Sequence, residues 1–145
     1  MILDHNGSLV TTLTDPNLLD GPWDLTINDR GELAEVFVSN VLNGTVTRIN
    51  LRIPKNGHPI VERMTQIASG YAHACSAAAV VVGPTGLAYD AAKDILYVAS
   101  TSDNVIFAVP HARKTTVGER TGRERIASCP GIRSKHRRAD IVLAT

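Results

Sequence analysis

Short apolar segments recur along the chain, and turn-forming residues separate them. Six of these segments are four to six residues long and rich in β-branched and aromatic residues, which is typical of β-strands. Dipeptides such as Asn43-Gly44 and Asp103-Asn104 favour tight hairpins between them. The pattern predicts strands at residues 25–28, 36–39, 45–50, 87–90, 95–99 and 105–109.

The segment at residues 95–99 (ILYVA) is apolar throughout and does not alternate with polar residues. A strand of this kind is expected to be covered on both faces of its sheet, so we expect sheets stacked face against face. A fourth, outer strand should follow each group of three. Ile60–Ala68 is predicted as the first of these, because its polar residues suit the edge of a sheet.

The chain contains an internal repeat. Residues 21–49 (GPWDLTINDRGELAEVFVSNVLNGTVTRI) align with residues 83–109 (GPTGLAYDAAKDILYVASTSDNVIFAV), with one two-residue insertion in the first segment. Turn, strand and hairpin positions recur together. The matched residues are Gly21-Pro22 with Gly83-Pro84, Leu25 with Leu87, Phe37-Val38 with Tyr97-Val98, Asn43-Gly44 with Asp103-Asn104, and Val46 and Ile49 with Ile106 and Val109.

The glycine-rich start of the second repeat does not fit a phosphate-binding loop. A P-loop needs Gly, four residues and then Gly-Lys-Ser/Thr, but Ala88 stands where the second glycine is required and no lysine follows. The dinucleotide pattern GxGxxG fails as well, because a predicted strand rather than a helix follows Gly86. The Gly-Pro pair is therefore interpreted as a turn before a strand.

Composition divides the chain into two parts. Residues 1–112 carry 6 Lys/Arg and 11 Asp/Glu, whereas residues 113–145 carry 9 Lys/Arg, 3 Asp/Glu and no aromatic residue. We predict that residues 1–112 fold and that residues 113–145 form a basic tail that is disordered or read out of frame. Binding of nucleic acid by the tail is the disfavoured alternative, since the tail has no aromatic side chains to stack on bases. Its basic cluster consists of Arg133, Lys135, Arg137 and Arg138.

Candidate chemistry outside the repeats is sparse. Cys75 and Cys129 form no CxxC motif, so a disulfide is left open, and the pair His73 and Cys75 is too small a set for zinc. The histidines match no zinc spacing; they are His5, His58, His73, His111 and His136. The N-terminus lacks the pattern of a signal peptide, and the most apolar run, residues 77–82, is too short for a membrane span, so no membrane partner is expected and the compartment stays open.

The segments GPWDLTI and GPTGLAYD, followed by VFVSN and LYVAS and then by NGTVTRI and DNVIFAV, resemble blades of an NHL-repeat β-propeller. The wider resemblance is to six-bladed SMP-30/gluconolactonase-like and streptogramin-lyase-like propellers. It implies an all-β fold of four-stranded antiparallel blades, with residues 1–112 as a partial propeller. The resembled families are often extracytoplasmic.

The resemblance also implies that blades are missing. Asn6-Gly7 and residues 8–13 predict the hairpin turn and third strand of an earlier repeat, so the chain holds about two and a half blades, whereas a ring closes with about four to eight. We expect a truncated or frame-shifted propeller. Assembly with other copies and a marginal two-blade structure are the alternatives.

In the resembled families, polar or metal-binding residues surround the central channel. Trp23, Asp24 and Asn40 occupy such positions here and are the candidate binding residues, although the second repeat does not repeat them. No catalytic or metal-binding residue is assigned, and Ca²⁺ enters only through the resemblance. We expect a non-catalytic binding or scaffold module, with a protein partner or self-association through exposed blade edges. The alternative is a fragment of a propeller enzyme that acts on a small cyclic ester.

Overall fold

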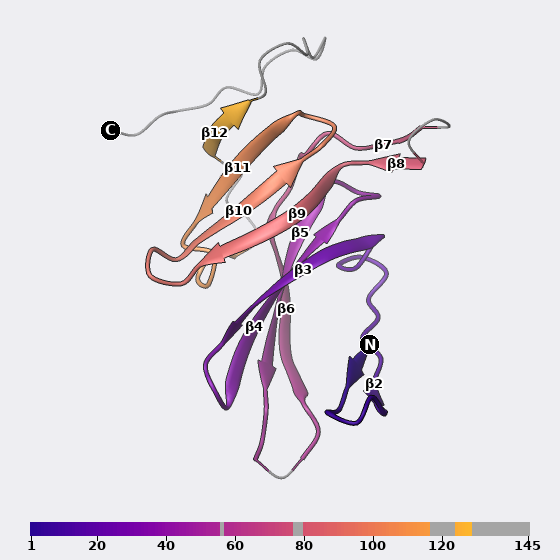
Figure 1. Ribbon diagram of the computed structural model, residues 1–145, viewed down its shortest axis with the longest axis vertical. Helices are drawn as coiled ribbons and strands as arrows, with labels where there is room; N and C mark the ends of the chain where they lie inside the picture. Colours follow the sequence, from indigo (N-terminus) through magenta and orange to yellow (C-terminus); the bar gives the residue numbers. More distant parts are fainter. Residues whose placement is uncertain (56, 77–79, 117–123, 129–145) are drawn as a thin grey trace.

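The computed structural model describes residues 1–55, 57–76, 80–116 and 124–128. Within these residues every regular element is a β-strand, and all pairings are antiparallel. The strands form two four-stranded sheets and two short two-stranded hairpins (Figure 1). The prediction of an all-β fold made of four-stranded antiparallel sheets is therefore confirmed.

The first sheet is a meander of four consecutive strands. It consists of β3 (Pro22–Asp29), β4 (Leu33–Asn40), β5 (Thr45–Arg52) and β6 (Ile60–Ala68), in that order across the sheet. Gly31 and Gly44 supply the positive φ angles, 81° and 65°, that the two tight turns require. The predicted strands are confirmed, including the outer strand at Ile60–Ala68, and the first three extend beyond the predicted limits.

The second sheet repeats this arrangement. It consists of β9 (Pro84–Asp90), β10 (Ile95–Ser100), β11 (Val105–Pro110) and β12 (Glu124–Ser128). Asn104 takes the place of Gly44 with φ of 53°, a conformation that asparagine tolerates better than most residues. The outer strand β12 lies within residues 113–145, the segment predicted to be a tail. Its residues 124–128 pair with β11 and belong to the second sheet. The tail's basic cluster and Cys129 lie outside the described residues.

Two hairpins complete the described fold. β1 (Ile2–Leu3) pairs with β2 (Leu9–Thr11), and the predicted turn at Asn6-Gly7 is confirmed, with the Asp4 carboxylate accepting the N–H groups of Asn6 and Ser8. The second hairpin, β7 (Ala74–Ser76) with β8 (Val80–Val82), lies in the connection between the two sheets and was not expected from the sequence.

The main core lies between the two four-stranded sheets. Phe37 of β4 packs against Tyr89 of β9 with ring centroids 4.9 Å apart, and Tyr71 meets Phe107 edge to face at 5.4 Å. β3 and β9, the edge strands that begin at the prolines of the two Gly-Pro pairs, lie side by side (Figure 1). The sheets are therefore stacked face against face, as expected from the apolar segment at residues 95–99.

A second apolar cluster lies on the opposite face of the first sheet. Ala34, Val38, Ile49 and Leu51 are buried there, and residues of the N-terminal segment cover them. The covering residues are Ile2, Leu13 and Leu19. The middle strands of the first sheet are thus covered on both faces. The prediction that residues 95–99 are covered on both faces is wrong: in β10 Leu96 and Val98 are buried, but the residues that alternate with them are only half-buried, so this strand is fully covered on one face only.

Candidate functional site

Asp24 connects the two sheets. Its Oδ2 accepts a hydrogen bond from the Leu87 N–H of β9 at 2.8 Å, and its own N–H donates to Ser39 Oγ at 3.1 Å. Ser39 Oγ in turn donates to the Thr85 carbonyl of the second sheet at 2.7 Å. We call this arrangement of Asp24 and Ser39 against β9 the polar clasp. It ties the edge strand of one sheet to the edge strand of the other.

Asn40 holds the N-terminal segment to the first sheet. Its side chain is fully buried, and its amide nitrogen lies 3.0 Å from the Leu18 carbonyl, 3.1 Å from Thr45 Oγ1 and 3.0 Å from Thr47 Oγ1. Thr47 Oγ1 also donates to the Leu18 carbonyl. The segment that covers the first sheet is therefore anchored by hydrogen bonds as well as by apolar contact.

Trp23 is exposed at the start of β3, where the register with β4 shifts between Pro22 and Leu25. The three candidate binding residues therefore contact three different surroundings: Asp24 the second sheet, Asn40 the N-terminal segment, and Trp23 the solvent. The structure does not bring them together into one group. Their role in ligand binding stays a prediction that rests on the resemblance alone.

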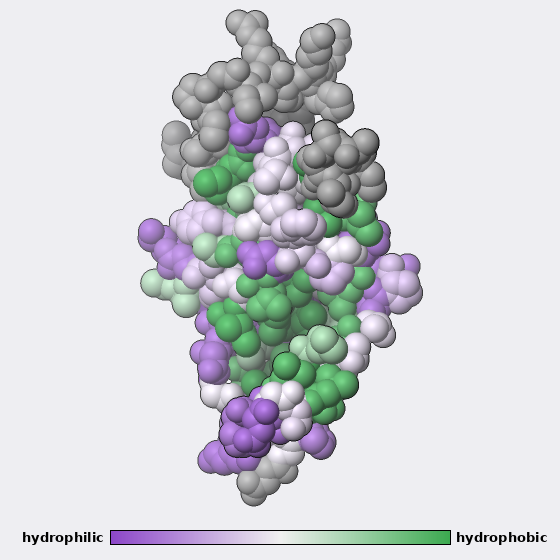
Figure 2. All heavy atoms as spheres, turned by 45° about the vertical axis from the view of Figure 1, so that its right-hand side comes forward, coloured by the Kyte–Doolittle hydropathy of each residue, from purple (hydrophilic) through white to green (hydrophobic). Residues whose placement is uncertain are grey.

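An exposed apolar stripe runs along β3. Trp23, Leu25 and Ile27 alternate with polar residues and are 59%, 61% and 53% exposed. Leu25 pairs with Val38 and Ile27 with Val36, so these two side chains lie on the face of the first sheet that points away from the second sheet. We call Leu25 and Ile27, together with the exposed Trp23 at the start of the same strand, the open face. Figure 2 shows apolar side chains gathered over a hollowed part of this side of the molecule.

The open face was missed in the choice of candidate residues, although the sequence carries its signal. The run Trp23-Asp24-Leu25-Thr26-Ile27-Asn28 alternates apolar and polar residues, which predicts apolar side chains on one face of a regular strand. Alternation cannot say whether that face is covered. Three large apolar side chains on one exposed strand are more than scattered surface residues require, and they indicate an interaction surface.

Two polar networks lie away from the open face and hold the end of the second sheet. Buried Arg48 donates to the carbonyls of Ala112 at 2.7 Å and Thr115 at 3.1 Å. The pKa of Arg48 is lowered, mainly because the side chain is buried and secondly because of the positive charge of Arg63. The Tyr89 hydroxyl donates to Asp94 Oδ1 at 2.9 Å. Burial and this hydrogen bond raise the pKa of Tyr89 to about 12.

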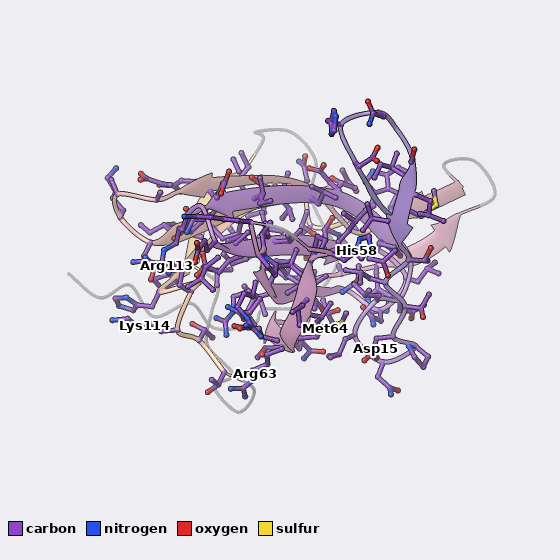
Figure 3. All side chains as sticks on the ribbon, turned by 90° about the horizontal axis from the view of Figure 1, so that it is seen from below. Asp15, His58, Arg63, Met64, Arg113 and Lys114 are labelled. Atoms are coloured by element: carbon purple, nitrogen blue, oxygen red, sulfur yellow. The ribbon has the colours of Figure 1, made fainter. Side chains whose placement is uncertain are left out.

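The remaining charged and metal-binding side chains of the described residues form no further candidate site. Among the described residues, no group of three or more His, Cys, Asp or Glu side chains is placed to hold a metal ion. Seen from below, Asp15 of the N-terminal segment and Arg113 and Lys114 after β11 lie on opposite sides of the molecule (Figure 3). No helix among the described residues is long and apolar enough to span a membrane.

Comparison of the chain with protein-family models, with curated proteins and with solved structures gives no match.

Proposed function

We propose that this chain is a non-catalytic binding or scaffold module of the NHL-type β-propeller kind, and that the open face is its working surface. The observation that carries the proposal is the exposure of Trp23, Leu25 and Ile27 on an otherwise well-packed sheet. Leaving three large apolar side chains in water costs several kcal/mol that a partner would recover on covering them, at about 1.5–3 kcal/mol for each fully buried side chain.

The blade interpretation is supported by the repeated meander and by the Gly-Pro pair at the start of each edge strand, β3 and β9. The alternative, a fragment of a propeller enzyme, draws no support from the described residues. Asp24 and Asn40, the polar residues expected at the channel side, make hydrogen bonds that hold the sheets and the N-terminal segment. A binding role therefore agrees better with the contacts.

A dye-binding experiment tests whether the open face is available in solution. Trp23 is the only tryptophan of the chain, so energy transfer from it to the apolar dye bis-ANS reports dye bound near β3. At low protein concentration, the wild-type chain should bind the dye with efficient transfer. Leu25→Asp and Ile27→Asp should each weaken binding about tenfold, because the face loses the burial of one large side chain.

Ile60→Asp is the matched control. Ile60 is also exposed, but it pairs with Arg52 on the opposite face of the sheet, so its substitution should leave the transfer unchanged. Absence of transfer in the wild-type chain would show that the face is covered by the chain itself, and equal transfer in all variants would show that the dye binds elsewhere. Either result would refute the proposed function.

A further inference from the structure

The contact between the two sheets can be described as two complementary halves. The first sheet contributes Phe37 and Val46, both fully buried, and the second sheet contributes Leu87 and Tyr89 of its edge strand. Phe37 and Tyr89 are in ring contact. The polar clasp adds two hydrogen bonds beside these apolar side chains. Apolar packing and hydrogen bonds therefore hold the two halves together.

The open face repeats one half of this contact. In the aligned repeats, Leu25 stands where Leu87 stands and Ile27 where Tyr89 stands. Leu87 and Tyr89 pack against the core between the sheets, whereas Leu25 and Ile27 are largely exposed. The second sheet contacts the first through Leu87 and Tyr89. The first sheet exposes the equivalent residues, Leu25 and Ile27, on its outward face.

The second sheet presents the other half outward. Tyr97 stands where Phe37 stands, and Ile106 stands where Val46 stands. The register places Tyr97 opposite Ala88 and Ile106 opposite Ala99, on the face that points away from the first sheet. Ile106 is 43% exposed, whereas Val46 is 0% exposed. We call Ala88, Tyr97, Ala99 and Ile106 the outer face.

The open face and the outer face lie on the two outward sides of one stack of sheets, so they cannot meet within one chain. We propose that they meet between chains: the outer face of one copy docks on the open face of a second copy and reproduces the contact between the two sheets. The proposal deepens the proposed function and rests on it. Such an interface is heterologous, so copies add head to tail and form a ring or an open series.

The new interface should be weaker than the contact within the chain. Gly86 stands where Asp24 stands and Ala99 where Ser39 stands, so the outer face lacks both side chains of the polar clasp. The N-terminal segment also already covers the middle strands beside the open face. We therefore expect association that is reversible and increases with protein concentration.

A complementation experiment with the full chain tests the proposal. Leu25→Asp removes the open face but keeps the outer face, and Ile106→Asp does the reverse; both side chains are exposed, so the core stays intact. In sedimentation velocity, the mean mass of the wild-type chain should rise with concentration. Each variant alone should remain a monomer, and an equimolar mixture of the two should form a dimer that grows no further.

The outcomes separate the alternatives. A wild-type chain that is monomeric at every concentration overturns the proposal, and so does a mixture that stays monomeric. Assembly of Ile106→Asp alone would mean that two open faces meet symmetrically, which also overturns it. Circular dichroism confirms that the variants fold, and Ile27→Asp serves as a second open-face variant. If the dye reaches the open face but copies do not associate, the proposed function survives and this inference fails.

A variant designed to strengthen the association tests the proposal without the risk that a substitution only disrupts the fold. Gly86→Asp with Ala99→Ser restores the polar clasp on the outer face. A Cβ at Gly86 meets only the Ala99 Cβ at 3.7 Å, an ordinary contact, so the backbone accepts a side chain there. The double variant should associate about tenfold more tightly than the wild type. Unchanged or weaker association would count against a docking geometry that copies the contact between the sheets.

Discussion

The side chains of β3 illustrate how one strand serves two surfaces at the scale of single residues. Asp24 turns toward the second sheet and accepts the Leu87 N–H, whereas Leu25 turns away and stays exposed. Neighbouring residues of a strand point to opposite faces, so the polar residue stabilises the stack while the apolar one is left for a partner. Polarity alone would have suggested the reverse assignment.

Tyr89 makes the stability of the fold depend on pH in the alkaline range. Its pKa is raised from 10.0 to about 12, first by burial and then by its hydrogen bond to Asp94, while Arg113 opposes the shift. Because the folded pKa lies above the unfolded one, the neutral phenol stabilises the fold fully below pH 10, and this contribution is lost as pH rises toward 12. The free energy of unfolding should therefore fall between pH 10 and pH 12.

Tyr89→Phe should remove this pH dependence and cost about 0.5–1.5 kcal/mol at neutral pH, the usual contribution of one hydrogen bond. Urea unfolding at a series of pH values measures both effects, and Tyr97→Phe is the control. An equally steep alkaline loss in Tyr89→Phe would contradict the assignment to this phenol.

At the scale of elements, the sequence predicted the strands whose signals are local and missed those that depend on distant segments. The four strands of the first sheet and the first three strands of the second followed from period, composition and the repeat, because those signals are local. The hairpin of β7 with β8 and the pairing of β12 did not, since their strands are short and depend on neighbouring chain segments. The burial of Asn40 was also hidden, because Leu18, its partner, lies 22 residues away.

Gly31 and Gly44 separate two effects of adding a side chain in a turn. Both have positive φ angles, but a Cβ at Gly31 meets nothing within 4 Å, whereas a Cβ at Gly44 would collide with the Tyr71 carbonyl oxygen and His73. Gly31→Ala should cost about 1 kcal/mol from backbone strain. Gly44→Ala should cost about 1–3 kcal/mol more, because the backbone of Tyr71 must move. Thermal unfolding measures the loss of stability in each variant. Equal losses would show that the Gly44 turn and Tyr71 move apart without cost.

At the scale of the whole molecule, the apolar segment at residues 95–99 predicted that the sheets stack, but nothing in the sequence predicted which surface is left outside. The identity of Trp23, Asp24 and Asn40 as polar or aromatic residues near strand ends could be read from the sequence, but their separate surroundings could not. Those surroundings depend on which face each sheet turns toward its neighbour, and contacts far apart in sequence decide this. The candidate site was therefore harder to predict than the fold.

Asp24 provides the last test, because a structural and a ligand-binding role predict different responses to the same two substitutions. Asp24→Ala removes the acceptor of the Leu87 N–H and should destabilise the stack by about 1.5–3 kcal/mol, the range for hydrogen bonds to charged groups. Asp24→Asn keeps an oxygen acceptor and should recover most of this loss. Urea unfolding measures the stabilities, and hydrogen exchange at the Leu87 amide reports the contact directly. If both variants fold with wild-type stability and Leu87 protection, the carboxylate does not hold the sheets together, and the ligand role that the resemblance implies would regain support.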